Sequence, residues 1–222
     1  MIVVIGALGL RGTMEEPAAD GLAPEIARAA AAVGVRVELI SKAGDDPAGD
    51  AVLLALASAG VGHVATLRDH ARPTPVRAQS AEPTDSADPT ADAEVDLASD
   101  GQAGDPADDE TSGDAPPTLD ADDVSLALRY LTDFEVLVAV HPSSDVLAEA
   151  VAAAGWTGAR LVVVTESDTE IPAGVPTDAL VVAAAADDAE GVGARIGRYA
   201  AALSRGDDAA TAYRDLTAPP TT

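Results

Sequence analysis

The sequence predicts an α/β fold in which helices cover a mostly parallel sheet. Short apolar runs rich in Val, Ile and Leu alternate with Ala-rich helical segments, and Gly or Pro stands at most junctions between them. Hydrophobic residues make up 47% of the 222 residues, but aromatic residues only 2%. Such a core closes by packing small helical side chains against a sheet.

The amino-terminal region, residues 1–72, forms one half of this domain. Pro24 falls in the first turn of a helix, where a missing N–H does no harm, and Gly34 ends that helix. The residues between the first strand and this helix, RGTMEEPAAD, are expected to form a loop. We expect strands at Ile2–Ile5, Val35–Ile40 and His63–Leu67, and helices at Leu22–Val33 and Pro47–Ala59.

Residues 73–119 are predicted to be a disordered, acidic insertion. They are rich in Pro, Asp, Ala, Ser and Thr, with few large apolar side chains to bury. Residues 78–123 contain 15 acidic residues and no basic ones, in a chain of net charge −25. The composition fits a solvated linker, and a functional acidic segment that binds cations or a basic partner is the alternative.

The carboxyl-terminal half of the same domain is predicted for residues 120–216, followed by a frayed tail at 217–222. The acidic DADD stretch at its start places negative charge at the positive end of a helix dipole. We expect helices at Asp120–Asp133, Ser144–Ala154, Gly191–Ser204 and Asp207–Leu216, and strands at Val136–Val140, Leu161–Thr165 and Ala179–Ala184.

Composition and charge exclude several classes of function. The strong negative charge repels phosphate backbones, so nucleic-acid binding is not expected. The chain has no cysteine, and its three histidines (His63, His70 and His141) lack metal-ligand spacing, so no metal site is expected. No apolar run approaches the ~20 residues of a membrane span, and the amino terminus does not resemble a signal peptide. A cytoplasmic protein is therefore expected.

A Gly6-x-x-Gly9-x-x-Gly12 pattern after the first strand raises the possibility of a dinucleotide-binding turn. That motif needs a helix to begin inside the glycine run, and here the helix begins only near Leu22. Glu38 lies 32 residues after Gly6, whereas the motif places its acid about 20 residues on. The spacing argues against a dinucleotide site.

The segment from Val37 to Val61 resembles the ribokinase-like (PfkB) carbohydrate and nucleoside kinases. It combines a strand, the acidic glycine turn Gly44–Asp50, a helix and an Ala-Gly-Val exit. The resemblance implies a three-layer ribokinase-like fold. Within the turn, Gly44, Asp46 and Gly49 are interpreted as structural, with Asp46 capping the helix that Pro47 begins.

The resemblance also assigns positions that bind substrate in the family. Arg11 falls on an Asp that accepts hydrogen bonds from a sugar hydroxyl, Gly21 falls on the second glycine of a Gly-Gly pair, and Glu25 falls on an Asn. A guanidinium only donates hydrogen bonds, so Arg11 cannot replace the Asp. Arg11 is expected either to pair with Glu15, Glu16 or Glu25, or to bind an anionic ligand.

Two further parts of a family active site are not recognisable. The acidic insertion follows Arg72-Pro73-Thr74, where family members carry a small lid of strands, so we expect a lidless fold shortened at its carboxyl end. The Gly-Ala-Gly-Asp motif, whose Asp is the base, is also missing, and Asp188 is the weak candidate for its place. ATP and Mg²⁺ are implied only if kinase activity is retained.

Ser143 and Ser144 follow a strand within His141-Pro142-Ser143-Ser144, where active-site loops occur, but a cap of the next helix is the simpler interpretation.

The sequence therefore favours a degenerate ribokinase-like protein without efficient kinase activity that serves as a scaffold for a small-molecule ligand or a partner. The alternative is an active kinase that transfers the γ-phosphate of ATP to a sugar or nucleoside hydroxyl. A homodimer is also expected, because a missing lid exposes sheet edge and apolar surface.

Overall fold

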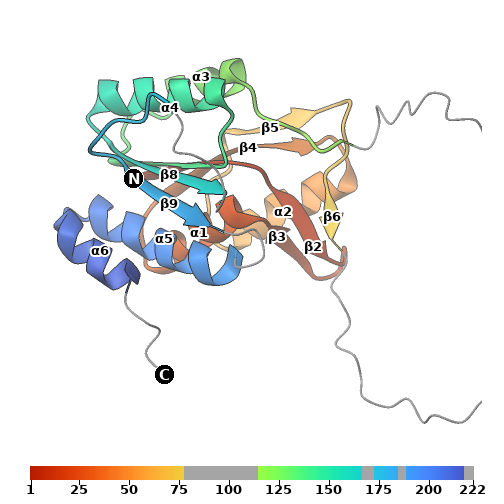
Figure 1. Ribbon diagram of the computed structural model, residues 1–222. Helices are drawn as coiled ribbons and strands as arrows, with labels where there is room; N and C mark the ends of the chain where they lie inside the picture. Colours follow the sequence, from red (N-terminus) through yellow and green to blue (C-terminus); the bar gives the residue numbers. More distant parts are fainter. Residues whose placement is uncertain (78–114, 167–172, 185–188, 218–222) are drawn as a thin grey trace, which may run out of the picture.

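Six strands pair in parallel to form the main sheet of this computed structural model, in the order β5-β4-β1-β7-β8-β9 (Figure 1). The structure describes residues 1–77, 115–166, 173–184 and 189–217. The strands of the main sheet are β1 (Ile2–Ile5), β4 (Val37–Gly44), β5 (Thr66–Asp69), β7 (Val136–Val140), β8 (Arg160–Glu166) and β9 (Leu180–Ala184).

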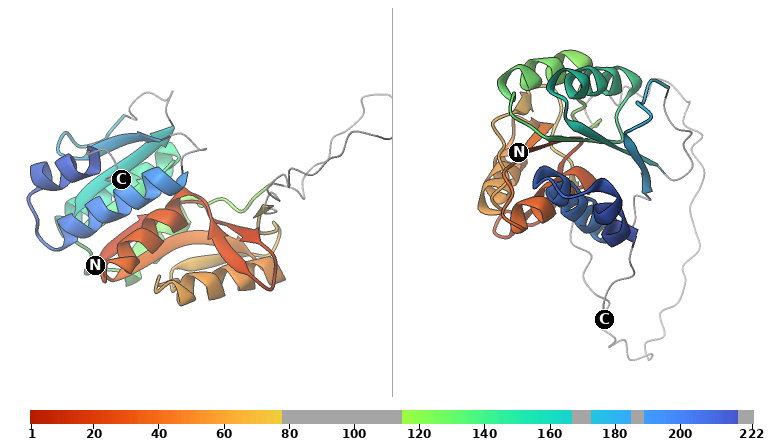
Figure 2. Two further views of the ribbon diagram at one scale, coloured as in Figure 1. Left: turned by 90° about the horizontal axis from the view of Figure 1, so that it is seen from below. Right: turned by 90° about the vertical axis from the view of Figure 1, so that its left-hand side faces the viewer.

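Both faces of the central strands are buried, which explains why β1 and β7 are continuous apolar runs. Side chains alternate between the two faces: Ile2 and Val4 of β1 pack into one core cluster, and Val3 and Ile5 pack into the other. Figure 2 shows the resulting three layers, with α3 and α4 on one face and α1, α5 and α6 on the other. The helices are α1 (Leu22–Ala32), α2 (Pro47–Ser58), α3 (Ala121–Tyr130), α4 (Ser144–Thr157), α5 (Ala189–Ser204) and α6 (Ala209–Thr217).

The predicted α/β fold with a parallel sheet is confirmed, and most element boundaries differ from the prediction by only a few residues. The largest shift within the main sheet is β4, which continues to Gly44 instead of ending at Ile40. Its last residues pair with β5, so Ser41–Gly44 belong to a strand. None of the described helices is long and apolar enough to cross a membrane.

A second, three-stranded sheet corrects the prediction of a loop before α1. Its order is β3-β2-β6, formed by β2 (Gly9–Gly12), β3 (Pro17–Asp20) and β6 (Val76–Arg77). Gly, Ala and Pro dominate β2 and β3 and have weak strand preference, so no local pattern predicts these strands. Pairing with β6, more than 60 residues away in sequence, completes the sheet.

The same strands decide two other predictions. Gly9–Gly12 form a strand and do not lead into a helix, so the glycine pattern is not a dinucleotide-binding turn. The predicted disordered insertion is too long at both ends, because residues 73–77 and 115–119 belong to the described structure. Residues 78–114 and the tail 218–222 lie outside the described residues.

Candidate functional site

A cavity of about 340 Å³ opens at the carboxyl ends of β1, β4 and β7. The chain places β4 and β5 on one side of β1 and β7, β8 and β9 on the other, so the sheet order reverses beside β1. Ligands of open α/β sheets bind in the crevice at such a reversal point. The cavity is lined by Ile5, Gly6, Ala7, Leu8, Ser41, Lys42, Pro75, Pro116, Pro117, Thr118, Leu119, Val140, His141, Pro142, Ser143 and Val146.

Gly6 allows α1 to approach the strand ends that form the floor of the cavity. A Cβ atom at this position would lie 2.7 Å from the Cβ of Ala23 and 3.1 Å from the Cβ of Val140. The buried hydroxyl of Ser41 donates to the carbonyl oxygen of Gly6 at 2.6 Å and ties the ends of β4 and β1 together. The floor is thus fixed by close packing and by a buried hydrogen bond.

His141 follows β7 in a left-handed backbone conformation, with φ of 45°. Such a conformation is unfavourable for a residue other than glycine, and it occurs most often at functional sites. The His141 N–H donates to the carbonyl oxygen of Val164 at 2.8 Å, which holds the bend against β8. The bend carries the chain from the sheet through Pro142 to α4, along the cavity wall.

Ser143 is the N-cap residue of α4, but its hydroxyl makes no capping hydrogen bond to the helix backbone. It contacts Asp145 instead, and this hydrogen bond, with smaller contributions from backbone N–H groups, holds the pKa of Asp145 below its ordinary value. Ser143 therefore occupies the predicted cap position without making the hydrogen bond of a cap. Ser144 is exposed, and neither its side chain nor that of Asp145 lines the cavity.

Lys42 is the only lysine in the sequence, and it lies on the cavity wall near the end of β4. Its Nζ donates to Oδ2 of Asp123 at 2.7 Å, and only 19% of its side chain is exposed. Asp123 belongs to the capping box that begins α3. The lysine therefore joins the main sheet to α3, and it is the only lysine or arginine among the described lining residues.

The part of the lining that the structure describes contains no carboxylate and no carboxamide side chain. Its polar side chains are those of Ser41, Lys42, Thr118, His141 and Ser143, and the rest of the lining is mostly aliphatic. The site therefore offers donors and apolar contact, and few acceptors for the hydroxyls of a sugar.

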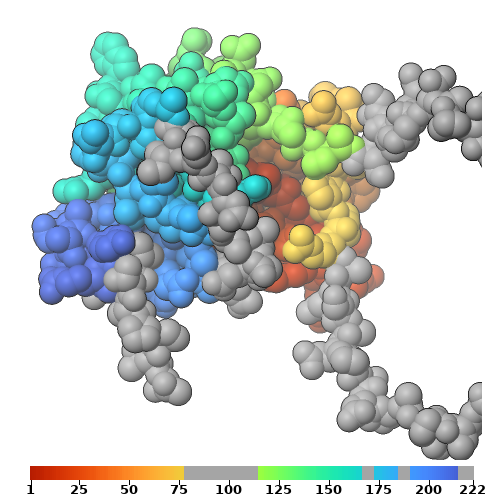
Figure 3. Space-filling view, viewed as in Figure 1, coloured from red at the N-terminus to blue at the C-terminus, as the bar shows by residue number. Residues whose placement is uncertain are grey.

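The two ends of the predicted insertion meet at the mouth of this cavity. Nη1 of Arg72 donates to the Thr118 hydroxyl at 2.9 Å, and the N–H of Leu10 donates to the carbonyl oxygen of Pro75 at 2.8 Å. In Figure 3, the green atoms of residues 115–119 lie beside the yellow atoms of residues 73–77. These segments belong to the site, although the sequence places them in a linker.

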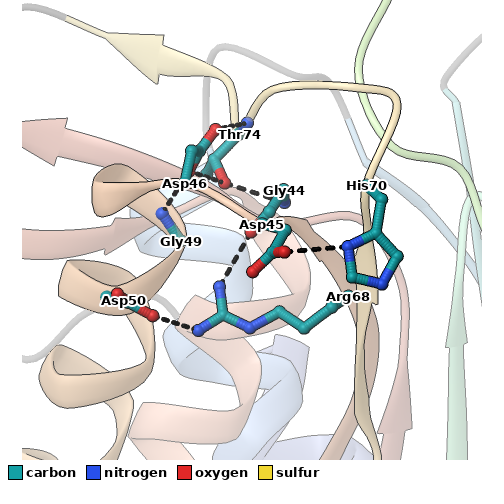
Figure 4. Close-up of polar contacts among 8 residues, drawn as sticks. All are labelled: Gly44, Asp45, Asp46, Gly49, Asp50, Arg68, His70 and Thr74. Atoms are coloured by element: carbon teal, nitrogen blue, oxygen red, sulfur yellow. Dashed lines mark hydrogen bonds and ion pairs between the residues drawn. The ribbon is translucent and has the colours of Figure 1, made fainter.

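The acidic glycine turn forms a dense polar network next to the small sheet (Figure 4). Asp46 caps α2 by accepting from the Gly49 N–H at 2.7 Å, and it also accepts from the N–H and hydroxyl of Thr74 at 2.7 and 2.9 Å. The Thr74 hydroxyl accepts from the Gly44 N–H at 2.9 Å, and Arg68 donates to the Gly44 carbonyl oxygen at 2.8 Å. The contacts match the structural role predicted for this turn.

Glycine is required in this turn because the backbone is crowded. A Cβ atom at Gly44 would lie 2.5 Å from the N–H nitrogen of Thr74, and one at Gly49 would collide with the carbonyl oxygen of Gly44. Burial alone would raise the pKa of Asp46, but the hydrogen bonds from Thr74 and Gly49 together lower it below the ordinary value of 3.8.

The three residues at family substrate positions do not line the cavity. Gly21 comes closest: its φ is 114°, and a Cβ atom there would lie 3.4 Å from the carbonyl oxygen of Ala7, a lining residue. Arg11 and Glu25 line a separate groove of about 500 Å³ between α1, α2 and β3.

Glu25 is nearly buried and pairs with Arg28, whose Nε lies 3.1 Å from Oε2. Within the described part of the chain, no ion pair joins Arg11 to Glu15, Glu16 or Glu25, so the predicted ion pair is wrong. Asp188, the weak candidate for the base, lies outside the described residues.

Lys42 and Ser41 belong to the site, although no sequence motif indicated them. One sequence feature could have indicated Lys42: it is the only lysine in 222 residues, and it follows a predicted buried strand.

The histidines are not brought together. His70 pairs with Asp45 at 2.8 Å and His141 lines the cavity, while buried Nδ1 of His63 has no partner in the described structure. Among the described residues, no three His, Asp or Glu side chains gather to hold a metal ion.

Comparisons with known proteins identify the fold. No protein-family model matches the sequence, and no curated protein matches it. Among solved structures, the protein Sa239 aligns over 100% of this chain and 95% of its own, with 13% identity and a TM-score of 0.63. An E. coli protein provisionally named ribokinase II, solved with ATP and Mg²⁺, aligns over 95% of this chain and 88% of its own, with 15% identity and a TM-score of 0.61.

A protein from Agrobacterium tumefaciens, provisionally named a ribokinase, aligns over 95% of this chain and 86% of its own, with 13% identity and a TM-score of 0.54. The chain spans only 52% of some other structures with which it aligns, among them the apo form of the E. coli ribokinase II. These likenesses define a ribokinase-like α/β fold, the class that the acidic glycine turn predicts.

Proposed function

We propose that this protein is a non-phosphorylating ligand-binding protein on a ribokinase-like scaffold. The ligand is a small molecule held at the carboxyl ends of β1, β4 and β7. One observation carries the proposal: among the described residues, the cavity lining contains no carboxylate or carboxamide side chain. The cavity lies at the point of the sheet where ligands bind in this class of fold.

Phosphoryl transfer to a sugar makes demands that this cavity does not meet. A base must accept the proton of the attacking hydroxyl, and Mg²⁺ needs oxygen ligands near the phosphates. The lining residues within 1–77, 115–166, 173–184 and 189–217 offer no carboxylate for either purpose, and the sugar-binding position of the family holds Arg11 in a different groove. The described residues thus do not fit an ATP–Mg²⁺ complex, and we derive no catalytic step through one.

The lining supports a ligand with an apolar body and one or more acceptor groups. Leu8, Val140 and Val146 provide aliphatic contact, while Lys42 and His141 provide donors. Apolar walls with a few polar groups are typical of small-molecule sites. Lys42 is already paired with Asp123, which partly neutralises its ammonium charge. A ligand acceptor that binds this ammonium therefore meets less than a full positive charge.

The binding proposal is tested by a thermal-shift screen of the full chain against metabolites with an apolar body and a carboxylate or carbonyl group. A compound that raises Tm is then titrated against two variants. Ser143→Tyr fills the cavity edge and should abolish the shift, whereas Ser144→Tyr changes an exposed neighbour outside the lining and should preserve it. If the ligand-induced rise in Tm were lost in both variants, or retained in both, the ligand would bind elsewhere.

An assay of ATP-dependent phosphorylation on a panel of sugars and nucleosides distinguishes the proposed binding protein from the alternative, an active kinase. We expect no transfer above background. Phosphorylation that disappears in Asp188→Ala would overturn the non-phosphorylating proposal and establish a base at that position.

A further inference from the structure

A second cavity, of about 260 Å³, is lined mainly by arginines, although the chain carries a net charge of −25. Its lining includes three guanidinium groups and a single carboxylate. The lining residues are Val33, Arg195, Arg198, Tyr199, Ala202, Arg205, Asp207 and Ala212.

This cavity lies at the opposite edge of the sheet from the ligand cavity described above. It is formed where the end of α1, the second half of α5 and the start of α6 meet. Because α1 ends just before β4 begins, this region is the amino edge of the parallel strands. The two cavities are therefore separate sites, and this one does not depend on the proposed function.

Ordinary ion pairs do not account for Arg198 and Arg205. Acidic residues outnumber basic ones by 38 to 13, so partners of opposite charge are abundant. Yet within the described residues Arg198 has no ion pair, and Nη2 of Arg205 lies 4.0 Å from Oδ2 of Asp207, at the limit of an ion pair. The helix dipole favours positive charge in the last turn of α5, but Arg195 and Arg198 both lie before that turn.

Tyr199 adds an independent observation. The residue is 7% exposed and lines the cavity, and its hydroxyl has no hydrogen-bond partner among the residues that the structure describes. The oxygen is not one of the described buried polar atoms that lack a partner, so it is accessible from the cavity. A phenol is protonated at neutral pH, and burial raises the pKa of Tyr199 further, so the hydroxyl can donate to a ligand in the cavity.

We propose that this cavity is a binding site for a phosphate-type oxyanion, either inorganic phosphate or the phosphate group of a small metabolite. Guanidinium groups match the geometry of phosphate oxygens and keep their charge, and a phenolic O–H adds a neutral donor. Arg198, Arg205 and Tyr199 are the residues that hold the anion, with Arg195 contributing positive charge to the same wall.

Calorimetric titration of the full chain with inorganic phosphate tests the site, with chloride adjusted to keep the ionic strength constant. Arg198→Gln removes one charge-assisted contact from an exposed side chain and should raise Kd about tenfold or more. Tyr199→Phe removes only the hydroxyl and should raise Kd about fivefold. The matched control is Arg129→Gln, which removes the same charge from exposed α3 and should leave Kd unchanged.

The outcomes separate a built site from general charge effects. No phosphate binding by the wild-type chain, or equal weakening by Arg198→Gln and Arg129→Gln, would overturn the proposal. Tighter binding of succinate than of phosphate would show a carboxylate site and would overturn the assignment to phosphate. Binding of a phosphorylated metabolite more tightly than inorganic phosphate would support the second source of the anion.

Discussion

At the scale of single residues, Asp46 joins parts of the chain that are far apart in sequence. Its carboxylate accepts hydrogen bonds from Gly49 at the start of α2 and from Thr74, 28 residues away. Thr74 is buried and precedes Pro75 on the cavity wall. The acidic glycine turn thus supports the site from behind without contacting a ligand.

Replacing Asp46 with Asn should destabilise the protein, because an NH₂ group would face N–H donors in place of one carboxylate oxygen. We expect a loss of about 1–3 kcal/mol in the free energy of unfolding at pH 7, measured by urea denaturation. Asp133→Asn is the control, since Asp133 is exposed and makes no hydrogen bond to another described side chain.

The effect of Asp46→Asn should depend on pH. The folded-state pKa of Asp46 is lowered, so its stabilising contribution is complete above the unfolded value, near 3.8. That contribution is lost as the pH falls through the folded-state pKa. The difference between wild type and variant should therefore narrow between pH 5 and pH 3, according to this linkage. A difference that stays constant over this range would show that the carboxylate charge is not responsible.

At the scale of elements, α1 and α5 approach closely because α5 carries glycines at its contact with α1. A Cβ atom at Gly197 would lie 2.5 Å from the carbonyl oxygen of Ile26 and 2.7 Å from the Cβ of Ala29. One at Gly193 would lie 2.7 Å from Cγ of Glu25. The spacing of four residues places both glycines on one face of α5.

Gly197→Ala should destabilise the protein by about 1–3 kcal/mol, because the added methyl group overpacks the contact between α1 and α5. The same substitution at an open helix position should change the free energy of unfolding in the opposite direction. Gly155→Ala in α4, where nothing lies within 4 Å of the added carbon, should stabilise the protein by roughly 0.5–1 kcal/mol. Thermal unfolding of both variants checks the pair, and stabilisation by Gly197→Ala would contradict the close contact.

At the scale of the whole molecule, the expected homodimer stays a prediction with a different basis. The small sheet weakens the argument from a missing lid, since β2, β3 and β6 occupy space that the sequence left open. The stronger reason is aromatic exposure. Trp156 is 91% exposed and Tyr130 is 77% exposed, in a chain where aromatic residues make up only 2%.

Sedimentation velocity should show a species of twice the 22.1 kDa mass of the chain. Because Trp156 is the only tryptophan, its emission should also shift to shorter wavelength as protein concentration rises. Trp156→Gln should shift the equilibrium toward monomer, whereas Leu54→Gln, at a residue 64% exposed on α2, should not. A stable monomer at all concentrations would exclude the dimer.

Much of the main sheet was predictable because its strands and helices are encoded locally. Val136–Val140 is apolar throughout and β-branched at alternate positions, and Asp46-Pro47 is a local signal for the start of a helix. The small sheet was not predictable in this way. Gly9–Gly12 and Pro17–Asp20 become strands only because they pair with each other and with Val76–Arg77.

The candidate site was predictable only in part. The end of β7, with His141 and Ser143, was noted as a loop where active sites occur, and both residues line the cavity. The positions taken from the family, Arg11 and Glu25, lie in another groove. Arg11 belongs to the β2–β3 hairpin, and Glu25 packs against Gly193 of α5.

The sequence by itself determined the layered α/β scaffold, since hydrophobic periodicity and helix-capping residues act over a few neighbouring positions. Only the tertiary structure decided where the ligand cavity lies and which side chains face it. Lys42, Pro75, Thr118 and His141 come from segments up to about 100 residues apart, and the parallel pairing of β1, β4 and β7 brings their ends to one edge. The gathering of Arg198, Tyr199 and Arg205 beside Val33 likewise depends on α1 packing against α5.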